Sequence, residues 1–525
     1  MALPYLQTIV LSIDESFWFL ISILALSLSI YVFTKRLKTG QSLPIPPGPK
    51  GLPLLGNLLS LEPEIHTHFA TLAKTYGPIF TLKLGLKLCV VITSPSLARE
   101  ILKDQDTIFA NRDIPAVALA MPYGGKDIVF TPYGPEWRML RRVCVHDMLG
   151  TSTLDSVYPI RFQEMRNTVK HLYGKAGCSV NIGEMMFLMV INVVTNMLWG
   201  SSVSASERAS IGSEFRKVVE EITQQIGKPN VSDFIPWLAW FDLQGVCKKM
   251  RKSGMKFDRI FNDVIDKSRR LGMNELDGDE DGGIKDFLQV LLKLKDEKNA
   301  KISLTMNHIK ALLLDMVVGG TDTTSNTIEF AMAEMMNKPE IIKKVQEELD
   351  NVVGKNKMVQ ECHIPNLPYL TSVMKEVLRL HPALPLMVPH CPSDSRVIGE
   401  TYTIPKSARV FINVWAIHRD PLLWENPLEF NPDRFVEGRG DYSGKDFSYI
   451  PFGSGRRSCA GIVMAERMTM FSLASLLHSF DWKLPEGEKL NIEEKFGIVL
   501  KKRTPLIAVP TPRLSNSALY ELSNI

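Results

Sequence analysis

The spacing of apolar residues along the chain predicts a mainly helical protein with a minor strand content. Between about Arg99 and Leu380 most apolar residues recur at intervals of three and four, as on one face of an amphipathic helix. Alternating or β-branched runs occur at Ile79–Leu84 and Leu88–Ile92, and a second strand-like group lies near Thr401–Val414. Another helical run follows Cys459. We therefore expect one large, mainly α unit with small sheets.

An uninterrupted apolar run stands near the N-terminus. Phe17–Phe33 carries no charge and is at the short end of what spans a bilayer as a helix. Lys35, Arg36 and Lys38 follow it, and no Lys or Arg precedes it, so the positive-inside rule places the N-terminus in the lumen of the endoplasmic reticulum and the rest in the cytosol. A cleaved signal peptide is the alternative, but the basic n-region and the small-residue cleavage site are both missing. We expect an uncleaved single-pass anchor within residues 1–36.

A proline-rich stretch separates this anchor from the rest of the chain. Residues 43–49 read Leu-Pro-Ile-Pro-Pro-Gly-Pro, and prolines at this density give a stiff, extended arm, although a generic linker is an equal alternative. The chain is thus divided into the anchor, a basic and proline-rich hinge at 37–50 and a single domain at 51–525. Within the domain, the acidic and glycine-rich stretch 274–283 predicts a surface loop, and a proline-rich irregular region is expected at about 420–452.

The composition of the chain adds no new element to this expected fold, but it excludes several classes of function. Hydrophobic residues make up 45% and charged residues 22% of the 525 residues, which suits a globular protein with a large core. The formal net charge of +4 is small for this length and gives no reason to propose nucleic acid as a partner. The seven cysteines are scattered, odd in number and nowhere in a C-x-x-C pair, which argues against a disulfide framework or a zinc knuckle and fits a reducing compartment. One of them can still be a ligand.

The segment with the strongest chemical signal surrounds Cys459. Pro451–Gly461 reads P-F-G-S-G-R-R-S-C-A-G, and a helical run begins directly after it. A thiolate that binds iron is anionic, so it needs backbone N–H donors and the positive end of a helix dipole nearby, and glycines let the backbone come close. The alternative is a buried structural thiol. The spacing F-x-x-G-x-R-x-C-x-G argues strongly for the ligand.

From Phe452 to Gly461 the chain resembles the haem-binding loop of the cytochrome P450 superfamily, and the resemblance extends over nearly the whole chain, with the anchor and proline hinge included. It is most like plant microsomal members that oxidise terpenoids or flavonoids. The resemblance implies the mainly α fold of that superfamily, and haem b with Cys459 as axial ligand. Gly453 belongs to the same cofactor loop. The implied activity inserts one oxygen atom from O2 into a hydrophobic plant secondary metabolite.

A glycine pair lies in a second motif, inside the helical pattern from about Thr305 to Met336. Gly319 and Gly320 each cost about 1 kcal/mol relative to alanine in a helix interior. A helix that tolerates both needs the space, which a flat cofactor with bound dioxygen would use; a kink or a flexible loop is the alternative. The following acid and alcohol could deliver protons to the distal oxygen. The resemblance assigns this proton relay to Asp322 and Thr323.

Two residues of a predicted helix offer donors for a carboxylate. Trp137 and Arg141 are four positions apart, so one helix face presents an indole N–H and a guanidinium. The resemblance implies that they hold a haem propionate together with Arg457 and His390. For His390, a hydrogen-bonded structural histidine is the alternative.

The resemblance also implies a scaffold. Glu376 and Arg379 are three positions apart on a helix that Pro382 ends. Their default reading is an exposed ion pair, which is worth little. In the family the pair instead joins an arginine, here Arg434, in a buried network that supports the cysteine loop.

The residues that the resemblance places near the substrate are all apolar, which favours a hydrophobic substrate. They are Leu314, Val318, Ala383, Leu384, Leu386, Val388, Ile498 and Val499. This lining does not distinguish a terpenoid from a flavonoid or another phenylpropanoid, nor does it fix the carbon attacked or the number of oxidations.

Electrons are expected from NADPH through a separate reductase of the endoplasmic reticulum, because no flavin or dinucleotide domain follows the haem-binding region. If Trp137 and Arg141 face the haem, then Arg138 and Arg142 form a second stripe about 100° round the same helix. With Arg456 they would make a basic patch for an acidic reductase face. An ordinary set of solvated charges is the alternative.

Two other functions are compatible with a cysteine loop of this kind. A haem-thiolate isomerase or dehydratase needs no reductase, but such enzymes depart from the acid–alcohol motif and the cysteine-loop spacing, and this chain departs from neither. A non-catalytic protein that binds haem or a hydrophobic ligand has no need of Asp322 and Thr323. Absorption spectra and NADPH consumption with reductase distinguish these functions from a monooxygenase.

Overall fold

The computed structural model describes residues 22, 43–200, 217–274, 286–296, 304–436, 438 and 440–521. The predicted membrane span at 17–33, apart from Ser22, lies outside the described residues, and so does nearly all of the predicted acidic loop at 274–283.

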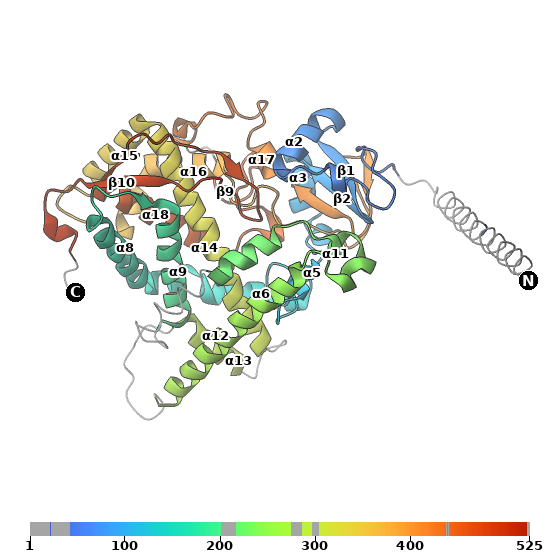
Figure 1. Ribbon diagram of the computed structural model, residues 1–525, viewed down its shortest axis with the longest axis horizontal. Coiled ribbons are helices and arrows are strands. Elements are labelled where there is room, and N and C mark those ends of the chain that lie inside the picture. Colours follow the sequence, from blue (N-terminus) through green and yellow to red (C-terminus); the bar gives the residue numbers. More distant parts are fainter. Residues whose placement is uncertain are drawn as a thin grey trace, which may run out of the picture.

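The described chain is mainly helical, as predicted, and the helices form most of the body around α14, whereas a small sheet lies at one end (Figure 1). The principal helices are α6 (Pro135–Arg142), α8 (Tyr158–Tyr173), α9 (Ile182–Trp199), α12 (Val246–Asn274), α13 (Phe287–Asp296), α14 (Met306–Asn337), α15 (Pro339–Val352), α16 (Pro368–Leu380) and α18 (Ile462–Ser479).

The long helix α14 organises the core. It begins after Thr305, whose hydroxyl accepts a hydrogen bond from the backbone N–H of His308, and it packs against α9, α16 and α18. Helix α9 is apolar on nearly all sides, with a mean hydropathy of 1.5. By length and composition α9 could cross a membrane, but 67% of it is buried inside the molecule, so its apolarity is explained by its place in the core.

The larger sheet has the order β1 (Ile79–Leu84), β2 (Lys87–Ile92) and β6 (Arg409–Ile412), with β1 antiparallel and β6 parallel to β2. The first two strands lie where the sequence predicted them. The strand-like group near Thr401–Val414 instead contains two strands of different sheets, β5 (Tyr402–Ile404) and β6. In Figure 1 this sheet lies beside α2 (Ile65–Tyr76) and α3 (Pro95–Arg99).

The described part of the proline-rich hinge is bound to this sheet. The side chain of Thr81 donates to the carbonyl of Pro46 at 2.9 Å, and its backbone N–H donates to Pro47 at 2.7 Å. A Cβ on Gly48 would lie 1.9 Å from the carbonyl oxygen of Thr81. From Pro46 to Gly48 the hinge is therefore an added edge of the domain rather than a free arm.

The C-terminal part returns to the core through small sheets. Strand β10 (Ile507–Pro512) pairs with β3 (Val180–Asn181) and β7 (Phe480–Lys483), and β8 (Glu494–Lys495) pairs with β9 (Lys501–Lys502). Between α17 (Val414–Ile417) and α18 the described residues form irregular chain with two short 3-10 turns, as the prolines predicted. This irregular chain leads to the cysteine loop at the start of α18.

Candidate functional site

The cysteine loop is a tight turn that ends at the N-terminus of α18. Gly453 and Gly455 adopt φ angles of 73° and 67°, which side chains disfavour, and a Cβ on Gly455 would lie 1.9 Å from the carbonyl oxygen of Leu102. The turn is closed by the backbone N–H of Cys459, which donates to Phe452 at 2.9 Å. The motif glycines are therefore required by the backbone.

The thiol of Cys459 is surrounded by protein but has exposed surface, and it opens onto a cavity. Burial raises its pKa, while the N–H of Gly461, 3.3 Å from the sulfur, and the guanidinium of Arg141 act in the opposite direction. The start of α18 adds the positive end of its dipole. These donors are the ones that a thiolate ligand needs.

This central cavity has a volume of about 310 Å³ and lies between α14, α6, the cysteine loop and the chain after α16. It is lined by most of the residues that the sequence singled out: Trp137, Arg141, Gly319, Gly320, Thr323, Ala383, Leu384, Val388, His390, Phe452, Gly453, Arg457, Cys459 and Gly461. The fold thus brings together, around this one cavity, residues as far apart in sequence as Trp137 and Gly461.

The glycine pair of α14 leaves that space open. A Cβ on Gly319 would meet nothing within 4 Å outside the helix itself, and one on Gly320 would lie 3.5 Å from Val194. Both positions are fully helical, so the predicted need for room holds here, and neither a kink nor a loop explains the pair. An added side chain would project into the cavity.

The predicted acid and alcohol point to different sides of α14. The hydroxyl of Thr323 lines the cavity and donates to the carbonyl of Gly319 at 2.7 Å. Asp322 is buried and lies outside the lining; its Oδ2 is 2.8 Å from Nζ of Lys501 on β9, in an ion pair without hydrogen-bond geometry. Since 34% of the Lys501 side chain is exposed, the acid is joined to a group that meets solvent.

The donors predicted for a propionate converge at one corner of the cavity. Arg457 donates to the carbonyls of Ala110 (2.7 Å), Ile128 (3.0 Å) and Thr131 (2.6 Å), and its guanidinium lies 4.4 Å from the centre of the Trp137 ring. The indole N–H of Trp137 also donates to Ile128, at 3.1 Å. The corner is therefore a set of cationic and N–H donors fixed by the backbone between residues 110 and 131.

The other two propionate candidates lie beside this corner. Arg141 reaches the hydroxyl of Ser458 and the carbonyl of Cys459, both at 3.4 Å. His390 lies 3.0 Å from the carbonyl of Phe109 through Nδ1, and burial lowers its pKa well below the usual value. His390 is therefore a neutral imidazole that lines the cavity and also has a structural hydrogen bond.

Arg112 is a cavity residue that sequence reasoning missed. It is buried, lines the central cavity, and donates to the carbonyls of Val129, Val388 and Pro389 at 3.1, 2.8 and 2.8 Å. Burial lowers its pKa to about 9, so it stays a cation at neutral pH. In the sequence Arg112 is an isolated arginine that belongs to none of the motifs described above, so nothing indicated its role.

The residues of the central cavity fit haem, the group that the sequence resemblance implies. One thiol stands at the N-terminus of α18, and the opposite wall has the glycine gap of α14. Three guanidiniums (Arg112, Arg141, Arg457) suit the two carboxylates of such a group. Iron accepts a thiolate ligand, and the flat macrocycle suits the gap.

Several predicted substrate contacts lie elsewhere. Leu386 and Ile498 line a second cavity of about 140 Å³, which shares Arg112, Met387 and Val388 with the central one. Val499 is buried outside both linings, and Leu314 and Val318 pack against the main core. These five side chains therefore lie outside the lining of the central cavity, and two of them line the cavity next to it.

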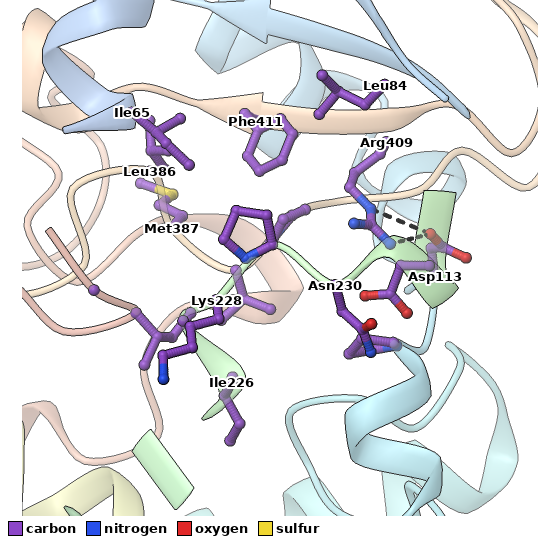
Figure 2. Close-up of a pocket in the computed structure, with 18 of the residues that line it drawn as sticks. Ile65, Leu84, Asp113, Ile226, Lys228, Asn230, Leu386, Met387, Arg409 and Phe411 are labelled. Atoms are coloured by element: carbon purple, nitrogen blue, oxygen red, sulfur yellow. Dashed lines mark hydrogen bonds and ion pairs between the residues drawn. The ribbon is translucent and has the colours of Figure 1, made fainter. Parts of the chain in front are cut away.

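Figure 2 shows the second cavity. The apolar side chains of Ile65, Leu84 and Phe411 lie across the space from Ile226 and Lys228, and the ion pair of Arg409 with Asp113 closes one side. The shared lining residues make this cavity the neighbour of the central one.

The predicted scaffold residues form a buried network. Arg379 and Glu376, both fully buried, make two hydrogen bonds of 2.7 and 2.8 Å, and Arg434 reaches the same carboxylate at 3.3 Å. Arg379 also donates to the carbonyl of His418, whose Nε2 accepts from the backbone N–H of Ile450 at 3.0 Å. The network thus reaches the chain that enters the cysteine loop.

Comparison with known proteins agrees with this arrangement. A family model described as Cytochrome P450 matches residues 46–509. The chain belongs to the cytochrome P450 family. A flavonoid 3'-monooxygenase of Crocosmia x crocosmiiflora is 40% identical to this P450 over 516 residues, which cover 96% of this chain and 99% of the relative. A flavonoid 3'-monooxygenase of Petunia hybrida is 40% identical over 91% of this chain and 94% of the relative.

Two further similarities extend the comparison. A 3,9-dihydroxypterocarpan 6A-monooxygenase of Glycine max is 38% identical over 90% of this chain and 94% of the relative. Among solved structures, a zebra fish cytochrome P450 with progesterone superposes with a TM-score of 0.73 at 26% identity, covering 85% of this chain and 99% of that one. This P450 is therefore a haem-thiolate monooxygenase that takes NADPH-derived electrons from a reductase and oxidises a hydrophobic substrate. The predicted fold, enzyme class and cofactor are confirmed.

Proposed function

We propose that this P450 hydroxylates the phenyl ring of a flavonoid, in the membrane of the endoplasmic reticulum. The observation that carries the proposal is a single cavity onto which the thiol of Cys459 and the hydroxyl of Thr323 both open, with an apolar lining between them. The similar plant monooxygenases named above support the flavonoid class. A flat, aromatic body suits a cavity whose other walls include Val194, Met316 and Leu384.

The side chains have the following roles. Cys459 would bind the haem iron through its sulfur, and haem, when bound, would supply the activation of dioxygen. Arg112, Arg141 and Arg457 would hold the propionates. Trp137, whose indole N–H already donates to Ile128, would support Arg457 from below, and the neutral His390, whose one N–H is directed at Phe109, would line this edge of the cavity without donating to a carboxylate. Gly319, Gly320, Phe452, Gly453 and Gly461 give the room and the backbone donors that the cofactor needs, and Glu376, Arg379 and Arg434 fix the loop that carries the cysteine.

Protons enter from the side of β9. Lys501 is partly exposed, and its ammonium is 2.8 Å from the buried carboxylate of Asp322. Thr323, the next residue, holds its hydroxyl in the cavity. Asp322 therefore passes protons from the surface, and Thr323 presents them inside the cavity.

The electron donor binds at the outer side of α6. Arg138 and Arg142 are exposed there, as the predicted second stripe requires. The guanidiniums of Arg138 and Arg456 each lie 5.8 Å from the ring centre of Tyr133, so the two meet at one point of the surface. Arg456 is also paired with Asp106 at 2.8 Å, which weakens its share of the field. Arg138 and Arg142 are the main contacts in this proposal.

Membrane attachment has two parts. The first is the apolar span at 17–33, with the N-terminus in the lumen and the catalytic domain in the cytosol. The second is an exposed apolar surface on the described domain: Trp240 and Phe241 are 94% and 69% exposed, and Leu243 and Trp237 lie beside them in the chain. Exposed aromatic side chains at this density are typical of contact with a lipid interface.

The proposal is tested with microsomes that contain this protein and a plant NADPH reductase. The membranes are incubated with a panel of flavanones, flavones and sesquiterpenes, and products are identified by mass spectrometry. A hydroxylated flavonoid that appears only with NADPH supports the proposal. Conversion of the terpenoids alone would contradict the flavonoid class while leaving the monooxygenase activity in place.

A further inference from the structure

A carboxylic acid lies in the wall of the central cavity, away from the predicted relay. Asp315 is on the same face of α14 as Gly319 and Thr323, at spacings of four residues, and all three line the cavity. At a rise of 1.5 Å per residue, Asp315 is about 12 Å from Thr323 along the helix axis. The cavity thus has an acid toward one end and an alcohol toward the other.

One oxygen of this acid has a structural partner and the other is available. Oδ2 of Asp315 accepts a hydrogen bond from the backbone N–H of Ile128 at 2.8 Å. Within the described chain Oδ1 has no hydrogen-bond partner, and it is not among the buried polar atoms that lack one, so it retains accessible surface. Because the residue lines the cavity, that surface is available to a ligand.

The charge state of the acid is set by its surroundings. Burial raises the pKa of Asp315 well above its usual value, and the nearby Asp127 carboxyl adds to the effect. Among the described residues no Lys, Arg or His forms an ion pair with Asp315, although Arg112 and Arg457 line the same cavity. A neutral carboxylic acid both donates and accepts hydrogen bonds, as a phenol does.

We propose that Asp315 is a specificity-determining residue, which hydrogen-bonds a hydroxyl of the substrate at the end remote from the oxidised carbon. The inference rests on the proposed flavonoid hydroxylation and narrows it. The substrate is an elongated aromatic with a hydroxyl roughly 12 Å along the cavity from the reacting ring, the distance between the two ends of the α14 face. In a flavonoid oxidised on its phenyl ring, that hydroxyl belongs to the far, fused ring.

Asp127 provides the matched control. Its Oδ1 accepts hydrogen bonds from the backbone N–H groups of Val129 and Phe130, so it holds the same loop that Asp315 holds through Ile128. Asp127 does not line the cavity. If Asp315 acted only by holding the loop, then Asp127→Ala, which removes the oxygen that holds the loop, would affect substrates in the same manner.

The experiment compares 7-hydroxyflavanone with unsubstituted flavanone in microsomes that contain the full chain and reductase. Dissociation constants come from substrate-induced absorption changes, and kcat and KM are measured separately. We expect the wild type to prefer the hydroxylated probe about tenfold in KM, the effect of one hydrogen bond. Asp315→Leu should bring that ratio close to one with little change in kcat. Asp315→Asn, which keeps a donor and the acceptor for Ile128, should restore much of the preference.

Asp127→Ala should alter both probes alike and leave their ratio near the wild-type value. If Asp315→Leu lacks the thiolate–carbonyl band, Asp315→Ala has the same expected ratio and takes its place. A wild-type ratio in the folded Leu or Ala variant of Asp315, or an equal loss of preference in Asp127→Ala, would overturn the inference. A wild type that oxidises neither flavanone would overturn the proposed function, and the inference with it.

Discussion

Cys459 is the residue on which the chemistry depends. Cys144 also lines the central cavity, but it lies on a helical turn away from the cysteine loop, and burial raises the pKa of its thiol. Cys391 is buried outside the lining of that cavity, and Cys362 is exposed on a short 3-10 turn. We expect Cys459→Ala to abolish the thiolate–carbonyl absorption band of the reduced protein, because the sulfur that would bind the haem iron is removed.

Cys391→Ala and Cys362→Ala are the matched controls for this measurement. Both should keep the band, since neither sulfur reaches the central cavity. A normal thiolate–carbonyl band in the Cys459→Ala protein would show that Cys459 does not bind the iron.

The relay gives a second prediction at the scale of single residues. Asp322→Asn should slow turnover by about a hundredfold, the usual effect of losing a positioned proton donor. Thr323→Ala should instead keep electron uptake and release more hydrogen peroxide per NADPH, because the hydroxyl that faces the cavity is lost. NADPH oxidation, product and peroxide are measured together. Equal coupling in the wild type and both variants would rule out the relay.

Lys501 extends the same prediction to a residue that no sequence pattern indicated. Lys501→Met should lower turnover in the same direction as Asp322→Asn, since the buried carboxylate loses its only ion-pair partner among the described residues. Lys501→Arg keeps the cation and should restore most of the rate. A Lys501→Met enzyme with wild-type coupling would show that the pair is structural.

At the scale of elements, α16 supports the cysteine loop through a buried pair. Arg379→Met leaves the carboxylate of Glu376 buried, with Arg434 as its remaining cation at 3.3 Å, and breaking such a pair costs about 3–5 kcal/mol. We expect a lower melting temperature and a smaller yield of protein with the thiolate–carbonyl band.

The exposed pair of Lys344 and Asp433 is the control, because both side chains are more than half exposed and the distance is 3.5 Å. Lys344→Met should change stability by no more than about 1 kcal/mol. An equal loss of stability in Arg379→Met and Lys344→Met would show that the buried pair of Arg379 and Glu376 supports the cysteine loop no more than an exposed ion pair does.

An element or site residue could be predicted when its signal lay within a few consecutive residues, and not when it depended on contacts between distant parts of the chain. The cysteine loop, α14 and the face of Trp137 and Arg141 are specified by spacings within a few residues, and a sequence records these directly. The pairing of Asp322 with Lys501 joins residues far apart in the chain, which only the folded molecule brings together. Arg112 was missed for the same reason. Its partners are backbone carbonyl groups, which every residue carries, so no side chain in the sequence marks the positions that bind it.

At the scale of the whole molecule, the proposed attachment to the membrane has two separate parts, the apolar run at 17–33 and the exposed Trp240 and Phe241. Deleting residues 1–36 should leave the haem site intact, because the domain from Pro46 onward includes every residue of the central cavity. The truncated protein should still be found partly on membranes, owing to the exposed Trp240 and Phe241. Flotation with vesicles measures this binding.

Adding Trp240→Ser and Phe241→Ser to the truncation should release most of the remainder, whereas Leu428→Ser, at another exposed apolar position, should not. Protection of the main domain from added protease in intact microsomes would contradict the cytosolic orientation.

The reductase surface gives the last prediction, since it joins the fold to the supply of electrons. Trp137 and Arg141 turn inward from α6, and therefore Arg138 and Arg142 turn outward. Charged patches act mainly on the association rate and weaken with salt. We expect Arg138→Glu with Arg142→Glu to slow reductase-supported turnover about tenfold at low salt, with a smaller effect at high salt, and to leave peroxide-supported turnover nearly unchanged.

The matched control for this double variant is Arg467→Glu with Lys344→Glu, a reversal of the same size at residues of α18 and α15. Arg467 is bound to Asp155 at 2.6 Å and Lys344 lies 3.5 Å from Asp433, so neither is a free cation on α6. If the control slows reductase-supported turnover as much as the α6 double variant does, then the reductase responds to the net charge of the protein and not to a patch on α6. If the α6 variant loses peroxide-supported turnover equally, then Arg138 and Arg142 serve the haem or the fold, because peroxide needs no docked partner.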